Sequence, residues 1–248
     1  IKWLIAEGLA QPSEILGLTF TEKASLEMQT RLDEVMPLGY TRMWIMTFHG
    51  FCESLLREHA LDIGLDPQFK VLTQIDSVAL LKKHFFEFDL DYYRPLGNPH
   101  KFLYAITTFF SRLYDEDVSP AEFSKWANDQ DDSKYQELAK LRLQFQKIKE
   151  EKGVLDFGDL IYYTLHLLEK RTKILETYRQ KFKYVLVDEF QDTNFAQIKL
   201  VKLLLNKNQS ITVVADDDQG IYQWRGAASG NVVAFQKSFP KIKLVTLN

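Results

Sequence analysis

The stretch that decides the fold class is Tyr184-Val185-Leu186-Val187-Asp188-Glu189-Phe190-Gln191-Asp192. Its four apolar, strand-forming residues run directly into two adjacent carboxylates, a pattern typical of a buried strand that ends at the polar edge of a parallel sheet. Ligands of open α/β folds bind at that edge. In phosphate-transfer sites one carboxylate holds Mg²⁺ and its neighbour orients and deprotonates the attacking water. Asp188 and Glu189 are therefore candidates for these roles, with a solvated strand end as the alternative.

Short apolar runs and helical patterns alternate on both sides of this stretch. Strands are predicted at 15–19, 43–47, 184–187, 211–214 and 244–246, and helices at 22–35, 50–60, 195–206 and 231–239. Such alternation predicts βαβ units around a parallel sheet, and hence an α/β core.

The alternation stops between about residues 69 and 153. Apart from a short strand at 69–72, helices are expected at 77–88, at 99–114, from the capped start Ser119-Pro120-Ala121-Glu122 and at 134–152, with a polar loop at 129–133. This region is predicted to be a helical subdomain inserted into the α/β core. The expected division is therefore 1–68 and 154–248 for the core and 69–153 for the insert.

Composition places the chain among globular proteins. Its 248 residues are 46% hydrophobic and 26% charged, with 11 Gly and 7 Pro, which excludes disordered and collagen-like classes. The net charge of -3 gives no global attraction to nucleic acid, so such a partner would need a local patch. Residues 134–183 hold 12 basic and 7 acidic side chains, which are either solvated helix faces or that patch.

Cysteine content and hydropathy bear on location. The single cysteine, Cys52, forms no internal disulfide and no cysteine-based zinc site, which indicates a reducing, cytoplasmic setting. All apolar runs are far shorter than the roughly 20 residues that cross a bilayer. No membrane partner is expected.

A second polar stretch follows the strand at 211–214. It reads Asp216-Asp217-Asp218-Gln219-Gly220-Ile221-Tyr222-Gln223-Trp224-Arg225-Gly226. An amide such as Gln219 can hydrogen-bond a phosphate oxygen, and exposed Tyr222 and Trp224 can stack on unpaired bases, with core packing as the alternative. The three aspartates lack EF-hand spacing, which argues against a calcium site.

A third pair of polar segments follows the first two strands. They are Thr19-Phe20-Thr21-Glu22-Lys23-Ala24 and Thr47-Phe48-His49-Gly50. Helix-start amides together with Thr21 and Lys23 suit a phosphate, while a simple helix N-cap by Thr21 is the structural alternative.

In this order, these segments resemble the UvrD/Rep/PcrA-type superfamily-1 DNA helicases over essentially the whole chain. Residues 19–24 resemble motif Ia (TFTNKA), with Glu22 where asparagine is usual, and residues 47–50 resemble the DNA-contacting motif that follows. Residues 156–161 resemble the DFDDLI element, 187–192 motif II, and 217–226 motif III (DDQSIYRFRGA). Ala215, where glycine is frequent, is a mild departure.

The resemblance implies a RecA-like P-loop NTPase core with an all-helical insert, and a role for each matched residue. Asp188 would hold Mg²⁺, Glu189 would activate the hydrolytic water, and Gln219 would sense the γ-phosphate of ATP. Gln191 and Asp192 would couple the nucleotide to the DNA. The implied contacts to single-stranded DNA come from Phe20, Thr21, Lys23, Thr47, His49, Tyr222, Trp224 and Arg225.

The resemblance also implies missing parts. No Gly-x-x-Gly-x-Gly-Lys-Thr/Ser loop occurs in the chain, and residues 1–8 resemble the end of the helix that follows that loop. We therefore expect a fragment of the first motor domain, inactive alone. Its parent would be a 3′-to-5′ helicase of DNA repair or replication. It would act on single-stranded DNA and single-strand/duplex junctions together with its remaining helicase domains. The alternatives are the motor of a RecB-like helicase–nuclease and a non-catalytic DNA-binding module.

Overall fold

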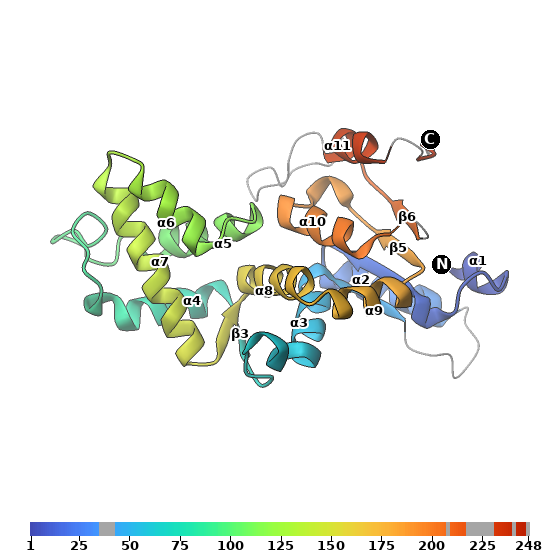
Figure 1. Cartoon of the computed structure of the whole chain (residues 1–248), viewed down its shortest axis with the longest axis horizontal. Coiled ribbons are helices and arrows are strands. Elements are labelled where there is room, and N and C mark those ends of the chain that lie inside the picture. Colours follow the sequence, from blue (N-terminus) through green and yellow to red (C-terminus); the bar gives the residue numbers. More distant parts are fainter. Residues whose placement is uncertain (35–42, 207–208, 217–230, 240–241, 247–248) are drawn as a thin grey trace. The chain divides into compact units, whose positions relative to one another are not determined.

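The computed structural model describes residues 1–34, 43–206, 209–216, 231–239 and 242–246 (Figure 1). The chain forms two compact units, one made of residues 1–48 and 176–248 and the other of residues 49–175. Each unit is described by itself. The boundaries at 69 and 153 that the sequence predicts for the helical insert stay a prediction.

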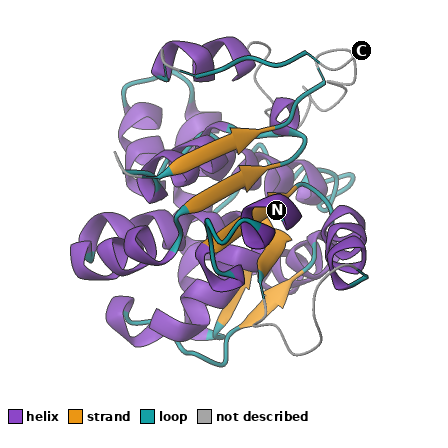
Figure 2. Cartoon of the chain, turned by 90° about the vertical axis from the view of Figure 1, so that its right-hand side faces the viewer, coloured by secondary structure: helices purple, strands orange, loops and turns teal. Residues whose placement is uncertain are grey.

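The first unit is built on a parallel sheet of four strands in the order β2-β1-β5-β6 (Figure 2). These strands are β1 (Ile15–Thr19), β2 (Trp44–Thr47), β5 (Tyr184–Val187) and β6 (Ser210–Val213). All three pairings are parallel, with Leu18 in register with Met46 on one side and Val187 on the other. The predicted α/β class and its parallel sheet are confirmed.

The prediction of a strand at 244–246 is wrong. Residues 242–246 belong to no strand, and Leu244 and Val245 are 69% and 64% exposed. An apolar run becomes a strand only when a neighbour completes its backbone hydrogen bonds. None of the described strands pairs with this run.

Helices of the first unit precede, connect and follow these strands. They are α1 (Lys2–Ala6), α2 (Glu22–Asp33), α10 (Phe195–Leu204) and α11 (Asn231–Ser238), with the short 3-10 turns η1 (Pro12–Glu14) and η4 (Phe190–Asp192). Thr21 and Asn194 cap α2 and α10, each accepting a hydrogen bond from the backbone N–H three residues later. All five residues of β1 are buried, so this central strand forms the middle of the core.

The second unit is mainly helical. It contains most of α3 (Phe48–His59), η2 (Ala60–Ile63), α4 (Gln74–His84), η3 (Phe85–Glu87), α5 (Leu103–Asp115), α6 (Pro120–Asn128), α7 (Ser133–Glu151) and α8 (Phe157–Lys170), while α9 (Thr172–Lys181) runs on into the first unit. The predicted capped start at Ser119 is confirmed by a capping box with Glu122. The strand expected at 69–72 forms as β3 (Lys70–Leu72) and pairs in parallel with β4 (Val154–Asp156), which the sequence analysis missed.

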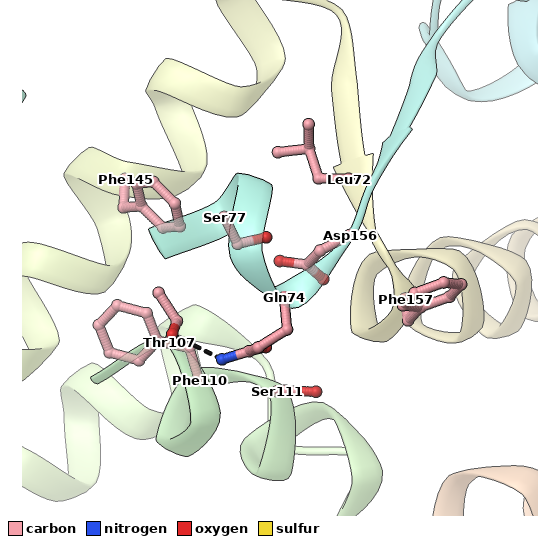
Figure 3. A pocket seen from close by; sticks show the side chains of 9 residues that line it. All are labelled: Leu72, Gln74, Ser77, Thr107, Phe110, Ser111, Phe145, Asp156 and Phe157. Carbon is pink, nitrogen blue, oxygen red and sulfur yellow. Dashed lines mark hydrogen bonds between the residues drawn. The ribbon is translucent and has the colours of Figure 1, made fainter. Parts of the chain in front are cut away.

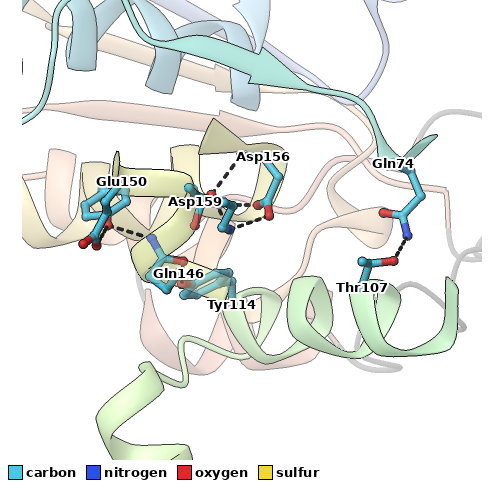
Figure 4. A network of polar contacts seen from close by, with 9 residues as sticks. Gln74, Thr107, Tyr114, Gln146, Glu150, Asp156 and Asp159 are labelled. Carbon is cyan, nitrogen blue, oxygen red and sulfur yellow. Dashed lines mark hydrogen bonds and ion pairs between the residues drawn. The ribbon is translucent and has the colours of Figure 1, made fainter. Parts of the chain in front are cut away.

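A buried ionic cluster joins α7 to the start of α8 (Figure 4). The Lys149 ammonium lies 2.7 Å from Asp156 Oδ2 and 2.6 Å from Asp159 Oδ2. Asp156 also caps α8, accepting from the Asp159 N–H at 3.0 Å, while Asp159 accepts from the Asp156 N–H at 2.8 Å. The two aspartates of the DFDDLI-like element therefore hold a helix start and neutralise a buried lysine.

No helix in the described ranges combines the length and apolarity that a membrane crossing requires.

Candidate functional site

The two carboxylates that follow β5 lie at the carboxyl edge of the sheet. The Asp188 N–H donates to Leu18 O at 2.9 Å, and the Phe190 N–H donates to Val214 O at 2.9 Å. The backbone around Asp188 and Glu189 is thereby fixed between the ends of β1 and β6. This arrangement matches the place where open parallel sheets bind ligands.

Glu189 adopts a backbone conformation that residues other than glycine rarely adopt. Its φ of 50° and ψ of 45° lie in the left-handed region. Such a residue costs on the order of 1–3 kcal/mol and persists only where the surrounding structure fixes it, which is common at functional sites. Here the following residue, Phe190, is fully buried and packs its ring 5.0 Å from that of Phe235 in α11. This packing anchors the turn that carries Glu189.

Gln191 connects Glu189 to the segment that follows β6. Its Nε2 donates to Glu189 Oε2 at 2.6 Å, and its Oε1 accepts from the Asp216 N–H at 3.1 Å. The Gln191 side chain is buried, and both bonds are partly shielded from water. The Glu189 carboxylate is thus held in one orientation by an amide that also holds Asp216, the residue before the predicted motif III.

The carboxylates of this turn are placed where negative charge is unfavourable. Burial, and then the charge of Glu189, raise the pKa of Asp188 above its usual range. The same two causes, in the same order, raise the pKa of Asp192, whose buried Oδ1 has no hydrogen-bond partner in the structure. A bound cation would relieve this concentration of charge.

The donor set fits Mg²⁺ bound together with phosphates. Among the described residues, no group of three or more His, Cys, Asp or Glu side chains converges on one point as a metal site. Mg²⁺ at phosphate-transfer sites uses one or two carboxylates and completes its shell with substrate oxygens and water. Asp188 alone, or with Glu189, supplies what such a site takes from the protein.

A cavity of about 500 Å³ opens beside Asp188. Its walls come from α1, α2 and β5, at Ile1, Lys2, Ala24, Glu27, Met28, Arg31, Leu32, Leu186 and Asp188. This volume lies within the range of small-molecule sites, roughly 300–1,000 Å³. The second unit holds a cavity of only about 40 Å³ between Gln74, Ser77 and Asp156, which has room for a few water molecules (Figure 3).

Polar residues also follow β1 and β2. Thr21 caps α2, and its carbonyl accepts a hydrogen bond from the Thr19 hydroxyl at 3.1 Å. The Thr47 hydroxyl, at the end of β2, donates to Glu22 Oε1 at 2.9 Å. Phe20 is half-buried and Lys23 is exposed. The strand order places the ends of β1, β2 and β5 at one sheet edge, so these residues share it with Asp188.

An aromatic pair lies within the second unit, and the sequence analysis names only one of its members, His49. The His49 ring lies edge-on to the Phe157 ring, with centroids 5.2 Å apart, and Phe157 is 46% exposed. The sequence analysis places Phe157 in the DFDDLI-like element and predicts no DNA contact for it. The signal available in the sequence is a large aromatic residue directly after the helix cap Asp156.

Several expected site residues lie outside the described residues. These are Gln219, Tyr222, Trp224 and Arg225, all within 217–230. The structure brings together Asp188, Glu189, Gln191 and Asp192 after β5. It places Phe20, Thr21 and Lys23 after β1, and Thr47 at the end of β2. Their roles stay predictions.

Comparison with known proteins identifies relatives over the whole chain. The family model described as UvrD/REP helicase N-terminal domain matches residues 1–240. ATP-dependent DNA helicase PcrA of Bacillus subtilis (strain 168) is 38% identical over 248 residues, covering 100% of this chain and 32% of that protein. The PcrA helicases of Staphylococcus epidermidis (strain ATCC 35984) and Staphylococcus aureus (strain Mu50) are 37% and 36% identical over 247 residues. The chain spans about a third of the length of these relatives.

Proposed function

The chain belongs to the UvrD/REP helicase N-terminal domain family, and we propose that it forms the first motor domain of an ATP-dependent DNA helicase. The observation that supports this most directly is the carboxylate pair Asp188–Glu189 at the carboxyl edge of a parallel sheet, tied through Gln191 to the end of β6. The parent protein would couple ATP hydrolysis to 3′-to-5′ movement on single-stranded DNA and to strand separation, in DNA repair or replication.

In the proposed reaction each acidic residue has a separate task. Asp188 would hold Mg²⁺, which neutralises charge on the phosphates of ATP when bound. Glu189 would orient the attacking water and accept its proton. Because Gln191 Nε2 donates to Glu189 Oε2, the other carboxylate oxygen is presented in a fixed direction for that water. Gln219, outside the described residues, would report the presence of the γ-phosphate.

The proposed DNA track uses stacking and phosphate contacts. Phe20, Tyr222 and Trp224 would stack on bases, while Arg225, Lys23 and the hydroxyls of Thr21 and Thr47 would contact phosphates. We add Phe157, because its exposed ring is paired with that of His49, a residue already expected on the track. Substitution of Trp224 by alanine should weaken single-strand binding by roughly 1–3 kcal/mol for any base sequence.

The proposal is tested by ATP hydrolysis of the full-length protein with and without single-stranded DNA. Glu189→Gln should lower the DNA-stimulated rate by about 10²- to 10⁴-fold and leave single-strand binding intact. The matched control is Glu34→Gln, a change at an exposed residue beyond α2. A rate that Glu189→Gln leaves unchanged would contradict the role of this residue, and absence of DNA-stimulated hydrolysis in the wild type would contradict the function. The isolated 248-residue chain should hydrolyse ATP no faster than its Glu189→Gln variant.

A further inference from the structure

Glu22 stands at the proposed DNA-contacting edge of the sheet and binds one of its residues. It is the first residue of α2, and its Oε1 accepts a hydrogen bond of 2.9 Å from the Thr47 hydroxyl. One end of this bond is buried, since Thr47 is 5% exposed, while Glu22 lies at the surface. Farther along α2, Gln29 Nε2 donates to Ile45 O at 2.6 Å, so α2 is joined to β2 at two levels.

The chemistry of this bond limits what Thr47 can do. A threonine hydroxyl has a single hydrogen, and an ionised carboxylate only accepts. While Thr47 donates to Glu22, that hydrogen is withheld from a phosphate oxygen. An amide at position 22 would behave differently, because its NH₂ group can donate to Thr47 Oγ1 and release the hydroxyl hydrogen. Asparagine, the usual residue of the motif that residues 19–24 resemble, is such an amide.

The charge of Glu22 acts in the same direction. The first turn of a helix attracts negative charge, and the carboxylate of Glu22 occupies this position in α2. A DNA phosphate approaching the exposed N–H groups of that turn would meet a like charge. Lys23, beside it, offsets the repulsion only in part because its side chain is long and exposed.

We propose that Glu22 is a positioning residue that occupies the Thr47 hydroxyl and thereby lowers the affinity of this motor domain for single-stranded DNA. The inference rests on the proposed function, since it assigns a weakening role within the proposed DNA track. With Glu22, the proposed DNA track binds the strand less tightly than it would with an amide at position 22. Release of the strand during each step is therefore faster. The chemical partner is the DNA phosphate, and base sequence is irrelevant to the effect.

The test is fluorescence anisotropy of a labelled oligothymidylate titrated with the full-length protein. At about 0.05 M NaCl, Glu22→Gln should bind about three- to tenfold tighter than the wild type. Glu34→Gln makes the same charge change at the other end of α2, about 18 Å away along the helix. That distance exceeds the Debye length of about 14 Å at 0.05 M salt, so this control should stay within about twofold of the wild type.

A double-mutant cycle separates the hydroxyl from the charge. Near 0.3 M NaCl, where exposed charges are largely screened, the gain from Glu22→Gln should persist with Thr47 present and vanish in the Thr47→Val background. A gain of equal size in both backgrounds, or no gain in either, would overturn the inference. Thermal melting of all variants verifies that each is folded.

Failure of the inference is distinguishable from failure of the function. If the wild type and the Glu22→Gln variant bind the oligonucleotide with equal affinity, only the role of Glu22 is contradicted. Wild type and variants that all fail to bind at low salt contradict the proposed helicase function.

Discussion

Replacement of the buried Lys149 by methionine should strongly destabilise the protein. Its ammonium lies 2.7 and 2.6 Å from carboxylate oxygens of Asp156 and Asp159, and its side chain is 3% exposed. Lys149→Met keeps the apolar stem and removes only the charge. Two carboxylates are then buried without a cation, and breaking a buried pair in this way costs about 3–5 kcal/mol. For a chain of this size the loss corresponds to a melting temperature lower by about 6–20 °C.

The pH dependence of that loss follows from the carboxyl pKa values. Burial and the charge of Asp156 raise the pKa of Asp159 to about 6 even though Lys149 opposes them. Without Lys149 this pKa rises further. A carboxyl whose pKa is higher in the folded than in the unfolded state stabilises the fold at low pH and loses that contribution as pH rises through the folded value. The loss of unfolding free energy in Lys149→Met, relative to the wild type, should therefore grow from about pH 5 to about pH 8. The increase is up to about 1.4 kcal/mol per pH unit for each proton released.

The assay is thermal and urea unfolding followed by circular dichroism at both pH values. Lys147→Met is the matched control, because Lys147 lies on the same helix, is 76% exposed and meets Glu151 only at 3.8 Å. Its effect should stay within about 0.5 kcal/mol. Adding Asp159→Asn to Lys149→Met removes one of the two stranded charges and should restore part of the stability. Equal melting of Lys149→Met and Lys147→Met at both pH values would refute the reasoning.

Three further predictions concern the buried Cys52 of the second unit and two residues of the first unit. Cys52 is fully buried and burial raises the pKa of its thiol to about 12, so a thiol reagent at about pH 8 should modify it only after unfolding; labelling of the native protein would contradict this. Asp188→Asn removes a charge that Glu189 repels, and should raise the melting temperature by about 1–3 °C while abolishing DNA-stimulated ATP hydrolysis of the full-length protein. Gln191→Ala releases the Glu189 carboxylate, and steady-state kinetics should show kcat lowered about tenfold or more with a smaller change in KM.

The sheet could be predicted from sequence because its signal is local. Each strand of the sheet is an apolar run bounded by polar residues, and the predicted ends at Thr19, Thr47 and Val187 agree with the structure. The same signal failed at 244–246, where an apolar run has no pairing partner among the described strands. At β4 the error is the reverse, because a strand forms that the local signal does not predict. The three residues of β4 become a strand only by pairing with β3, which is distant along the chain. Pairing between distant segments leaves no periodic pattern in either of them.

The acidic motifs show a related limit. Acids at the ends of two strands illustrate it: Asp188–Glu189 follow β5, and Asp156–Asp159 lie around the end of β4. The structure gives them different environments: Lys149 neutralises the second pair, whereas no lysine or arginine ion pair is found for the first among the described contacts. The spacing of three residues between Asp156 and Asp159 indicates a capping box. The lysine that neutralises their charge, however, comes from another helix. Charge compensation is a tertiary property, and it separates the structural acids from the proposed catalytic ones.

Gln191 offers a physical route for the proposed coupling between nucleotide and DNA. Its amide has two groups, and the structure uses one for the Glu189 carboxylate and the other for the Asp216 N–H. Asp216 immediately precedes residues 217–230, which hold the predicted phosphate sensor Gln219 and the predicted stacking residues Tyr222 and Trp224. A rotation of the Glu189 side chain, whose backbone already lies in a strained conformation, cannot keep both bonds of a rigid amide unchanged. A change at the proposed hydrolytic carboxylate would therefore be transmitted to Asp216, the residue before the predicted stacking segment, through one buried side chain. This is the coupling that the Gln191→Ala kinetics would measure.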